Sequence, residues 1–340
     1  MWNIVGHEGT LNLLLQSLKQ QRLSHSYLFV GPPQVGKTTI ARTFAQALNC
    51  REASPAMRCG HCSQCKRISS DLHPDVQIIS VDLSGSSSGS KTEVGIDQIR
   101  DLQGNTYLMP YEGRCKVYIF PEADRLSLGA SNALLKLLEE PPDSVVFLLL
   151  SSRPDYIIPT IISRSQRIDL SPVSVRDMTA KLLEIGDLSP SRAQEIATFS
   201  NGSVGWAIQA TLDPDILPAY IARIEEITGL IEGGMEVRLS FAERFGASFY
   251  ANRDASISHL NNIAEWWRYL LLIKESDGQI PYQIPAKNSI QRCANWISSR
   301  NAVEAIKMTQ ETILSLGKNA NPRLALDVLM LSLPIKWEQS

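Results

Sequence analysis

The chain has 340 residues, of which 44% are hydrophobic and 20% charged, and this ordinary globular composition accommodates roughly two or three domains. Its formal net charge of −2 argues against a surface that binds nucleic acid throughout, because neutralising phosphates needs clustered lysine and arginine, so any DNA contact is local or shared with partners. No apolar run approaches the ~18 residues that cross a bilayer, and the first residues do not resemble a leader, so we expect a cytoplasmic protein without membrane contact.

The predicted elements alternate between helix and strand in the first half of the chain. Leucines at helical spacing predict a helix over residues 9–20. Runs of β-forming residues, separated by helix-like stretches, predict strands over 27–30, 76–81, 117–120, 145–150 and 166–170. This order indicates an α/β fold with a parallel sheet, and the nearly continuous apolar strands indicate burial on both faces. From residue 171 onwards the pattern is helical.

A phosphate-binding loop stands between the first strand and the next helix. Residues 31–38 read Gly-Pro-Pro-Gln-Val-Gly-Lys-Thr, which is the P-loop pattern. The glycines let backbone N–H groups turn toward phosphate oxygens, Lys37 reaches the terminal phosphates, and Thr38 can ligate Mg²⁺. We therefore expect bound ATP or ADP; the alternative is a chance match in a glycine-rich turn. The expected nucleotide-binding residues are Gly31, Pro32, Gln34, Val35, Gly36, Lys37, Thr38 and Thr39.

Four of the six cysteines lie close together after this helix. In a reducing compartment, four thiolates at such spacing suit the tetrahedral coordination of structural Zn²⁺. We expect a zinc module over residues 50–65. The alternatives are free cysteines, or a site in which His61 replaces one thiolate. The expected ligands are Cys50, Cys59, Cys62 and Cys65.

The acidic groups needed for hydrolysis are incomplete. A P-loop ATPase has an Asp that holds Mg²⁺ and a Glu that orients the attacking water, at the end of the strand beside the phosphate loop. Here Pro121 stands where that Asp would be, and Glu122 follows in register as the candidate catalytic carboxylate, the alternative being a solvated carboxylate at the strand end. Asp124 lies further along, where we interpret it as a helix cap. Nucleotide binding can then persist while hydrolysis fails.

Three polar residues further along are candidates for contact with a terminal phosphate. Ser151 and Ser152 follow a strand, so that a hydroxyl could reach the phosphate or the attacking water, or else cap the next turn. Arg164 stands before the last strand, where a planar cation could be directed at a neighbouring subunit's nucleotide. An ordinary surface arginine is the alternative.

Together these features resemble the clamp-loader branch of the AAA+ ATPases. The resemblance implies a P-loop AAA+ core over 1–170 with its inserted zinc module, a helical lid over 171–212, and an all-α collar over 213–340 that joins subunits into a ring. Besides the phosphate loop and the cysteines, it is carried by residues 5–8, 25–31, 132–142, 163–165 and 319–327.

Departures from the family pattern imply a specific role. Pro121 replaces the magnesium-binding Asp, and Gly205 replaces the second-sensor arginine. Ser165 replaces a Cys, whereas Arg164 is retained. The resemblance therefore implies a subunit that binds ATP or ADP, hydrolyses it slowly or not at all, and supplies Arg164 as a trans arginine finger to an adjacent motor subunit.

The implied partners are the gamma/tau motor subunits and the delta subunit of a DNA polymerase III loader. The sliding clamp and primer-template DNA are reached through the assembled complex. Two alternatives remain open from the sequence. One is a hydrolysing motor subunit of the same loader, and the other is a zinc-bearing nucleic-acid-binding module whose phosphate loop is vestigial.

Overall fold

The computed structural model describes residues 2, 4–52, 58–81, 93–276, 284–318 and 320–335. Residue 319 of the collar motif and part of the cysteine module, residues 53–57, lie outside this description. The chain divides into two compact units, Met1–Ile208 and Gln209–Ser340. Within the described ranges, no helix is both long and apolar enough to span a membrane.

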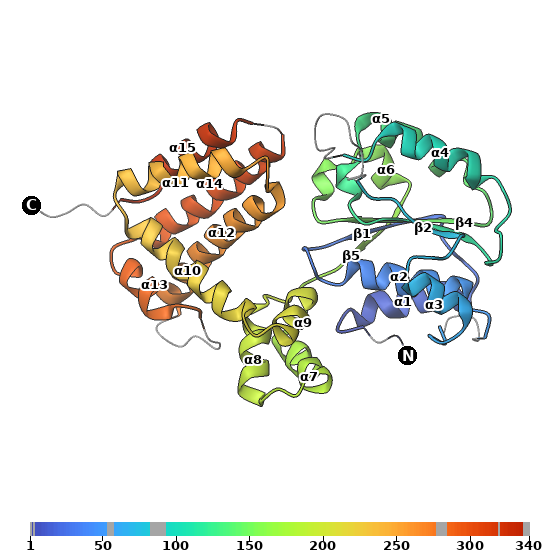
Figure 1. Ribbon diagram of the computed structural model, residues 1–340, viewed down its shortest axis with the longest axis horizontal. Coiled ribbons are helices and arrows are strands. Elements are labelled where there is room, and N and C mark those ends of the chain that lie inside the picture. Colours follow the sequence, from blue (N-terminus) through green and yellow to red (C-terminus); the bar gives the residue numbers. More distant parts are fainter. Residues whose placement is uncertain are drawn as a thin grey trace, which may run out of the picture. The chain divides into compact units, whose positions relative to one another are not determined.

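The first unit contains a parallel five-stranded sheet in the order β2-β3-β4-β1-β5 (Figure 1). The strands β1, β3 and β4 are buried along their whole length, which confirms the prediction of a sheet covered on both faces. The strand predicted over 76–81 is shorter than expected because it lies at the sheet edge and pairs only with β3. The bounds are β1 Ser26–Val30, β2 Val76–Ile78, β3 Lys116–Phe120, β4 Val145–Ser151 and β5 Gln166–Asp169.

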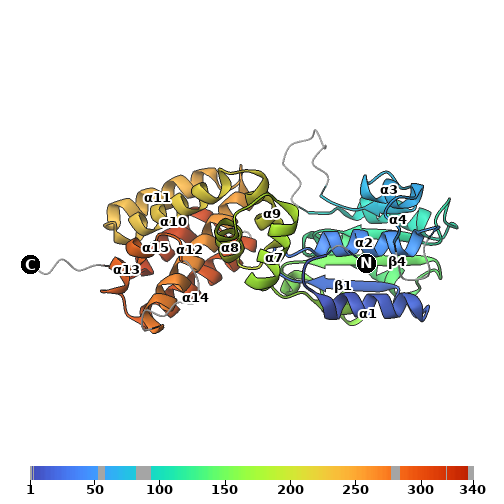
Figure 2. The same ribbon diagram turned by 90° about the horizontal axis from the view of Figure 1, so that it is seen from below.

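Helices cover each face of this sheet. In Figure 1, α1 (Glu8–Lys19), α2 (Lys37–Asn49) and α3 (Ser63–Ser69) lie on one face. The other face carries α4 (Ile96–Thr106), α5 (Leu128–Glu139) and α6 (Pro159–Ser163). Figure 2 views the molecule from the side of α1 and α2.

Alternate residues of the strands enter two separate cores, one on each face. Phe29 of β1 packs with Phe44 of α2, whereas its neighbour Leu28 packs with Leu134 of α5. This period of two is that of a pleated strand, and it explains why both faces need apolar cover. The α/β core predicted from the alternating elements is confirmed.

Three short helices end the first unit, and the last of them continues past the boundary at Ile208. They are α7 (Val175–Ile185), α8 (Pro190–Phe199) and α9 (Val204–Leu212). Ser174 and Ser189 cap the first two through side-chain oxygens that accept a backbone N–H, as serine does at helix starts. The lid boundary at residue 212 stays a prediction, since the division into units falls after Ile208.

In the part of the second unit that the structure describes, the regular elements are helices joined by turns. Its core surrounds Trp266 and Trp267, both fully buried, and the indole Nε1 of Trp266 donates to Thr228 Oγ1 at 2.8 Å. At the start of α15, Asn321 Oδ1 accepts the N–H of Leu324. The bounds are α10 Ile216–Glu232, α11 Met235–Ser248, α12 Arg253–Glu275, α13 Lys287–Ala294, α14 Ser299–Gly317 and α15 Pro322–Ser332.

Candidate functional site

The phosphate loop joins β1 to α2 and is shaped by its two glycines. The N–H of Gly31 donates to Ser151 O at 3.1 Å, and a Cβ at Gly31 would lie 2.6 Å from Leu170 O, so only glycine fits this close approach. Gly36 has φ 110°, a left-handed conformation that favours glycine, and α2 begins at the next residue. The first N–H groups of α2 have no acceptor within the helix and are available to an anion.

Lys37 is folded over this loop. Its Nζ donates to Gly31 O at 2.7 Å, to Pro32 O at 2.7 Å and to Ser152 Oγ at 2.9 Å. Burial lowers the pKa of Lys37 to about 8, and the charge of Asp124 acts in the opposite direction. The glycines, the helix start and this cation together fit the phosphates of a nucleoside di- or triphosphate.

The outer side of the loop is held by residues from distant segments of the same unit. His7 Nε2 lies 3.1 Å from Val35 O, and the N–H of Gly205, in α9, donates to Gln34 O at 2.9 Å. A Cβ at Gly205 would lie 3.0 Å from the Cβ of Gln34. An arginine at 205 would therefore need Gln34 or α9 to move by a few tenths of an ångström. Nothing in the sequence pattern indicated this contact.

The acidic side chains after β3 are both engaged by arginines. Asp124 Oδ2 accepts from Arg153 Nε and lies 2.8 Å from its Nη2, and Asp124 Oδ1 accepts from Ser151 Oγ at 2.9 Å. Glu122 Oε1 lies 3.3 Å from Arg125 Nε. The interpretation of Asp124 as a helix cap is wrong, because the residue lies inside the short helix η1 (Ala123–Arg125) and its carboxylate pairs with β4's end instead.

These contacts decide whether the residues fit Mg²⁺. The cation prefers oxygen ligands that include one or two carboxylates. Thr38 supplies a hydroxyl, but Pro121 has no side-chain oxygen, and the carboxylates of Glu122 and Asp124 are paired with guanidinium groups. The donor set at the ends of β3 and β4 therefore lacks a carboxylate at the usual Mg²⁺ position, because Pro121 has none and the largely buried side chain of Asp124 is paired with Arg153. The exposed pair of Glu122 with Arg125 is weak and does not by itself exclude Glu122.

Ser151 and Ser152 were each considered as a phosphate contact or as a cap of the following turn, and the structure gives them different partners. Ser152 Oγ accepts from Lys37 and so lies at the phosphate loop. Ser151 Oγ accepts the N–H of Arg153 at 3.0 Å, which caps the following turn, and donates to Asp124. Arg153 itself was missed in the sequence, because an arginine after a strand usually lies in solvent.

Arg164 follows α6 at the surface of the first unit. Its Nη2 lies 2.8 Å from Glu139 Oε1, with the two side chains 37% and 50% exposed. Its Nη1 also donates to Thr160 O at 3.4 Å. Exposed pairs of this kind contribute about 0–1 kcal/mol, so Arg164 is held weakly within its own chain.

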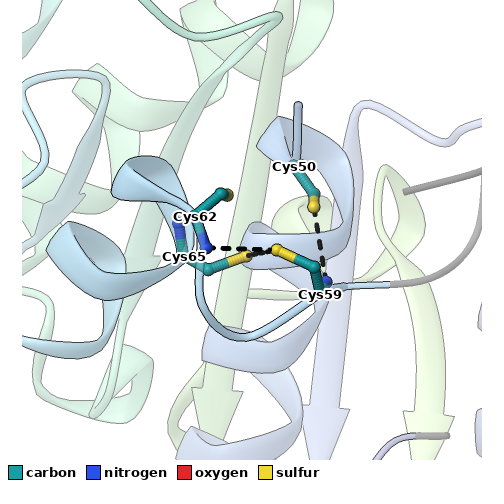
Figure 3. A group of neighbouring side chains, drawn as sticks. All are labelled: Cys50, Cys59, Cys62 and Cys65. Carbon is teal, nitrogen blue, oxygen red and sulfur yellow. Dashed lines mark hydrogen bonds between the residues drawn. The ribbon is translucent and has the colours of Figure 1, made fainter. Parts of the chain in front are cut away.

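The cysteine side chains converge, as Figure 3 shows. All four sulfur atoms lie within 4.8 Å of one another. Burial raises the pKa of Cys59 and Cys65, whereas in Cys62 hydrogen bonds, first from the N–H groups of Cys65 and Arg51, outweigh burial and lower the pKa to about 6. Such a set fits the four thiolates of a structural zinc site. His61 forms a more exposed group with Glu52 and Cys59, and its Nδ1 lies 3.1 Å from Glu52 Oε2.

Comparison with known sequences gives consistent matches. Residues 6–174 match the model of the family described as DNA polymerase III, delta subunit. DNA polymerase III subunit tau of Bacillus subtilis is 34% identical over 237 residues, which cover 67% of this chain and 40% of that protein. Subunit tau/gamma of Haemophilus influenzae is 39% identical over 183 residues, covering 54% and 25%. Subunit delta' of Bacillus subtilis is 35% identical over 191 residues, covering 56% and 55%.

The chain thus spans between 25% and 55% of the length of these relatives. Among solved structures, a gamma subunit-related protein from Thermotoga maritima has a TM-score of 0.45 at 18% identity, covering 94% of this chain and 97% of that one. The DNA clamp loader delta protein of Bacillus subtilis has a TM-score of 0.35 at 12% identity, covering 94% and 98%.

Proposed function

The chain belongs to the DNA polymerase III clamp-loader family, and we propose that it is the delta' subunit of such a loader. In this role it holds ATP or ADP with little or no hydrolysis and supplies Arg164 to the ATP site of a neighbouring gamma/tau motor subunit. The assembled complex, which includes a delta subunit, loads a sliding clamp onto primed DNA during replication. That role also gives the expected cytoplasmic location.

The observation that carries this proposal is an intact phosphate loop beside acids that are both paired with arginines. Hydrolysis needs a carboxylate or similar group that orients the attacking water and a metal that neutralises the developing charge. Glu122 and Asp124 are engaged by Arg125 and Arg153, whereas Lys37 remains at the loop. Nucleotide binding should therefore be retained, whereas hydrolysis lacks a metal-binding Asp at position 121 and has only Glu122, held in a weak exposed pair, to orient water.

Support for the trans role comes from the weak local attachment of Arg164. An exposed guanidinium held by a surface carboxylate and a 3.4 Å hydrogen bond to Thr160 O can leave them at little cost when a phosphate is presented. A planar cation at the transferring phosphate contributes on the order of 10³-fold or more to the rate in related chemistry. The gain from a neighbour's nucleotide therefore exceeds the loss of the pair with Glu139.

We propose that Zn²⁺ is held by the cysteine cluster and has a structural role. Four thiolates would fill all four positions of a tetrahedral zinc ion and leave none open to water or substrate, which is typical of structural rather than catalytic zinc. The module follows α2 directly, so the metal would fix the end of the helix whose start forms the phosphate loop.

Two assays test the proposal. The purified chain should show negligible ATP turnover, and adding it to motor and delta subunits should restore loader activity; rapid hydrolysis by the chain alone would instead indicate a motor subunit. Nucleotide affinity should fall when Lys37→Ala is compared with wild type and with the exposed control Lys19→Ala. An unchanged affinity in Lys37→Ala would favour a nucleic-acid-binding module with a vestigial loop.

A further inference from the structure

The guanidinium of Arg153 forms an ion pair with Asp124. Asp124 is also the carboxylate whose charge acts on Lys37 of the phosphate loop. Asp124 is 7% exposed at its side chain, and Arg153 approaches its Oδ2 through both Nε and Nη2 at 2.8 Å. Asp124 therefore pairs directly with Arg153, while Lys37 donates to Ser152, the residue that precedes Arg153.

Several contacts fix Arg153 in this place. Its backbone N–H donates to Ser151 Oγ, and Ser151 Oγ in turn donates to Asp124. The guanidinium carbon lies 5.0 Å from the centre of the Tyr156 ring, within the range of a cation–π contact. An arginine held by a carboxylate, a capped turn and an aromatic ring is preorganised, so it loses little freedom when an anion arrives.

The position matters because β4 lies between β1 and β3, so that the end of β4 lies beside the phosphate loop and the end of β3 lies one strand further. In a P-loop protein this is where a metal ion bridges the strand's carboxylate and the phosphates. Here Pro121 leaves that place without a carboxylate, while Arg153 brings a fixed positive charge to the next strand end. Guanidinium is permanently protonated and carries five N–H donors, so an arginine that approaches Asp124 through Nε and Nη2 still has further N–H groups that can bind phosphate oxygens.

We propose that Arg153 substitutes for the divalent cation, so that this chain binds nucleoside triphosphate independently of Mg²⁺. The inference rests on the proposed nucleotide binding and specifies its chemistry. Arg153 neutralises phosphate charge from its own strand end, while Asp124 holds the guanidinium in position. Metal-independent binding also suits a subunit that retains its ligand, since the bound nucleotide then needs no metal that could assist its hydrolysis.

The test is the dissociation constant for ATP in excess Mg²⁺ and in EDTA, measured by calorimetry on the full chain. The wild type should bind with equal affinity in both, within about twofold. Arg153→Gln should weaken binding in EDTA about tenfold, the effect of losing one charge-assisted hydrogen bond, and Mg²⁺ should restore part of the loss through the released Asp124. Arg153→Lys keeps the positive charge, so its ATP affinity in EDTA should lie between those of the wild type and Arg153→Gln.

Arg167→Gln is the matched control, because Arg167 also pairs with an aspartate, Asp169, but on the exposed edge strand. It should match wild type in both buffers. Pro121→Asp provides a second test that leaves Arg153 in place: restoring a carboxylate should make binding about tenfold tighter in Mg²⁺ than in EDTA.

The outcomes separate this inference from the proposed function. If the wild type binds ATP in Mg²⁺ but its affinity falls tenfold or more in EDTA, the nucleotide-binding role stands. The proposal that Arg153 takes the place of Mg²⁺ is then overturned. The proposal that Arg153 takes the place of Mg²⁺ is also overturned if the Arg153→Gln variant binds ATP with wild-type affinity in both buffers. Absence of binding in either buffer removes the nucleotide role itself, and the inference with it.

Discussion

Replacing Arg164 by alanine should slow hydrolysis in the assembled ring without destabilising the chain. Within its own chain Arg164 pairs with Glu139, and the side chains are 37% and 50% exposed, so its loss should change the free energy of unfolding by less than ~1 kcal/mol. At a neighbour's nucleotide, losing a trans arginine should slow the chemical step by on the order of 10³, equivalent to ~4 kcal/mol of transition-state stabilisation. The difference in size distinguishes the two roles.

The assay uses loaders reconstituted with motor and delta subunits. Single-turnover hydrolysis should reveal the one slowed site, whereas the steady-state rate should fall only by that site's share. The thermal midpoint of the isolated chain should stay unchanged. Glu139→Gln removes the local pair but keeps the arginine, so it should hydrolyse at the parental rate, and Arg167→Ala serves as a surface control. Parental hydrolysis in Arg164→Ala rings, or an equal loss in Glu139→Gln rings, would refute the trans role.

Two further changes probe the zinc module and the phosphate loop. Cys59→Ser should reduce bound zinc in the reduced protein from about one equivalent to less than about half, by metal analysis, whereas Cys115→Ser should retain it; unchanged zinc in Cys59→Ser would favour a site completed by His61. Gly31→Ala should destabilise the chain by about 1–3 kcal/mol in denaturant unfolding, because its Cβ would lie 2.6 Å from a backbone oxygen. Gly104→Ala, in α4 with nothing within 4 Å of the added Cβ, should be neutral or stabilising, and equal effects of both alanines would contradict the close-packing argument.

The centre of the sheet was predictable from sequence because β1, β3 and β4 are buried along their whole length and are therefore largely apolar. The phosphate loop was predictable for a different reason: its chemistry depends on residues that are consecutive in the chain. The pairing of Asp124 with Arg153 was not, since it joins segments that only the β3–β4 register brings together. The contact between Gly205 and Gln34 is similar, because two backbones meet there and neither side chain carries the interaction.

The proton on Lys37 links this geometry to a pH-dependent affinity. Burial lowers the pKa of Lys37 in the free site to about 8, so Lys37 loses its proton as the pH rises through that value. Phosphate oxygens favour the charged amine and should raise the pKa when nucleotide is bound. Binding therefore takes up a proton above about pH 8, and affinity must fall as the pH increases.

The size follows from the fraction of Lys37 that is charged in the free chain. With a pKa of about 8, this fraction falls about tenfold between about pH 7 and pH 9, and the association constant for ADP should fall by the same factor. Lys37→Arg keeps its charge throughout this range and should give a flat profile, although its absolute affinity differs. Calorimetry in two buffers of different ionisation enthalpy reports the proton uptake directly. A flat wild-type profile with no uptake would mean that the amine stays charged despite its burial, and that the three oxygens around it already compensate for desolvation.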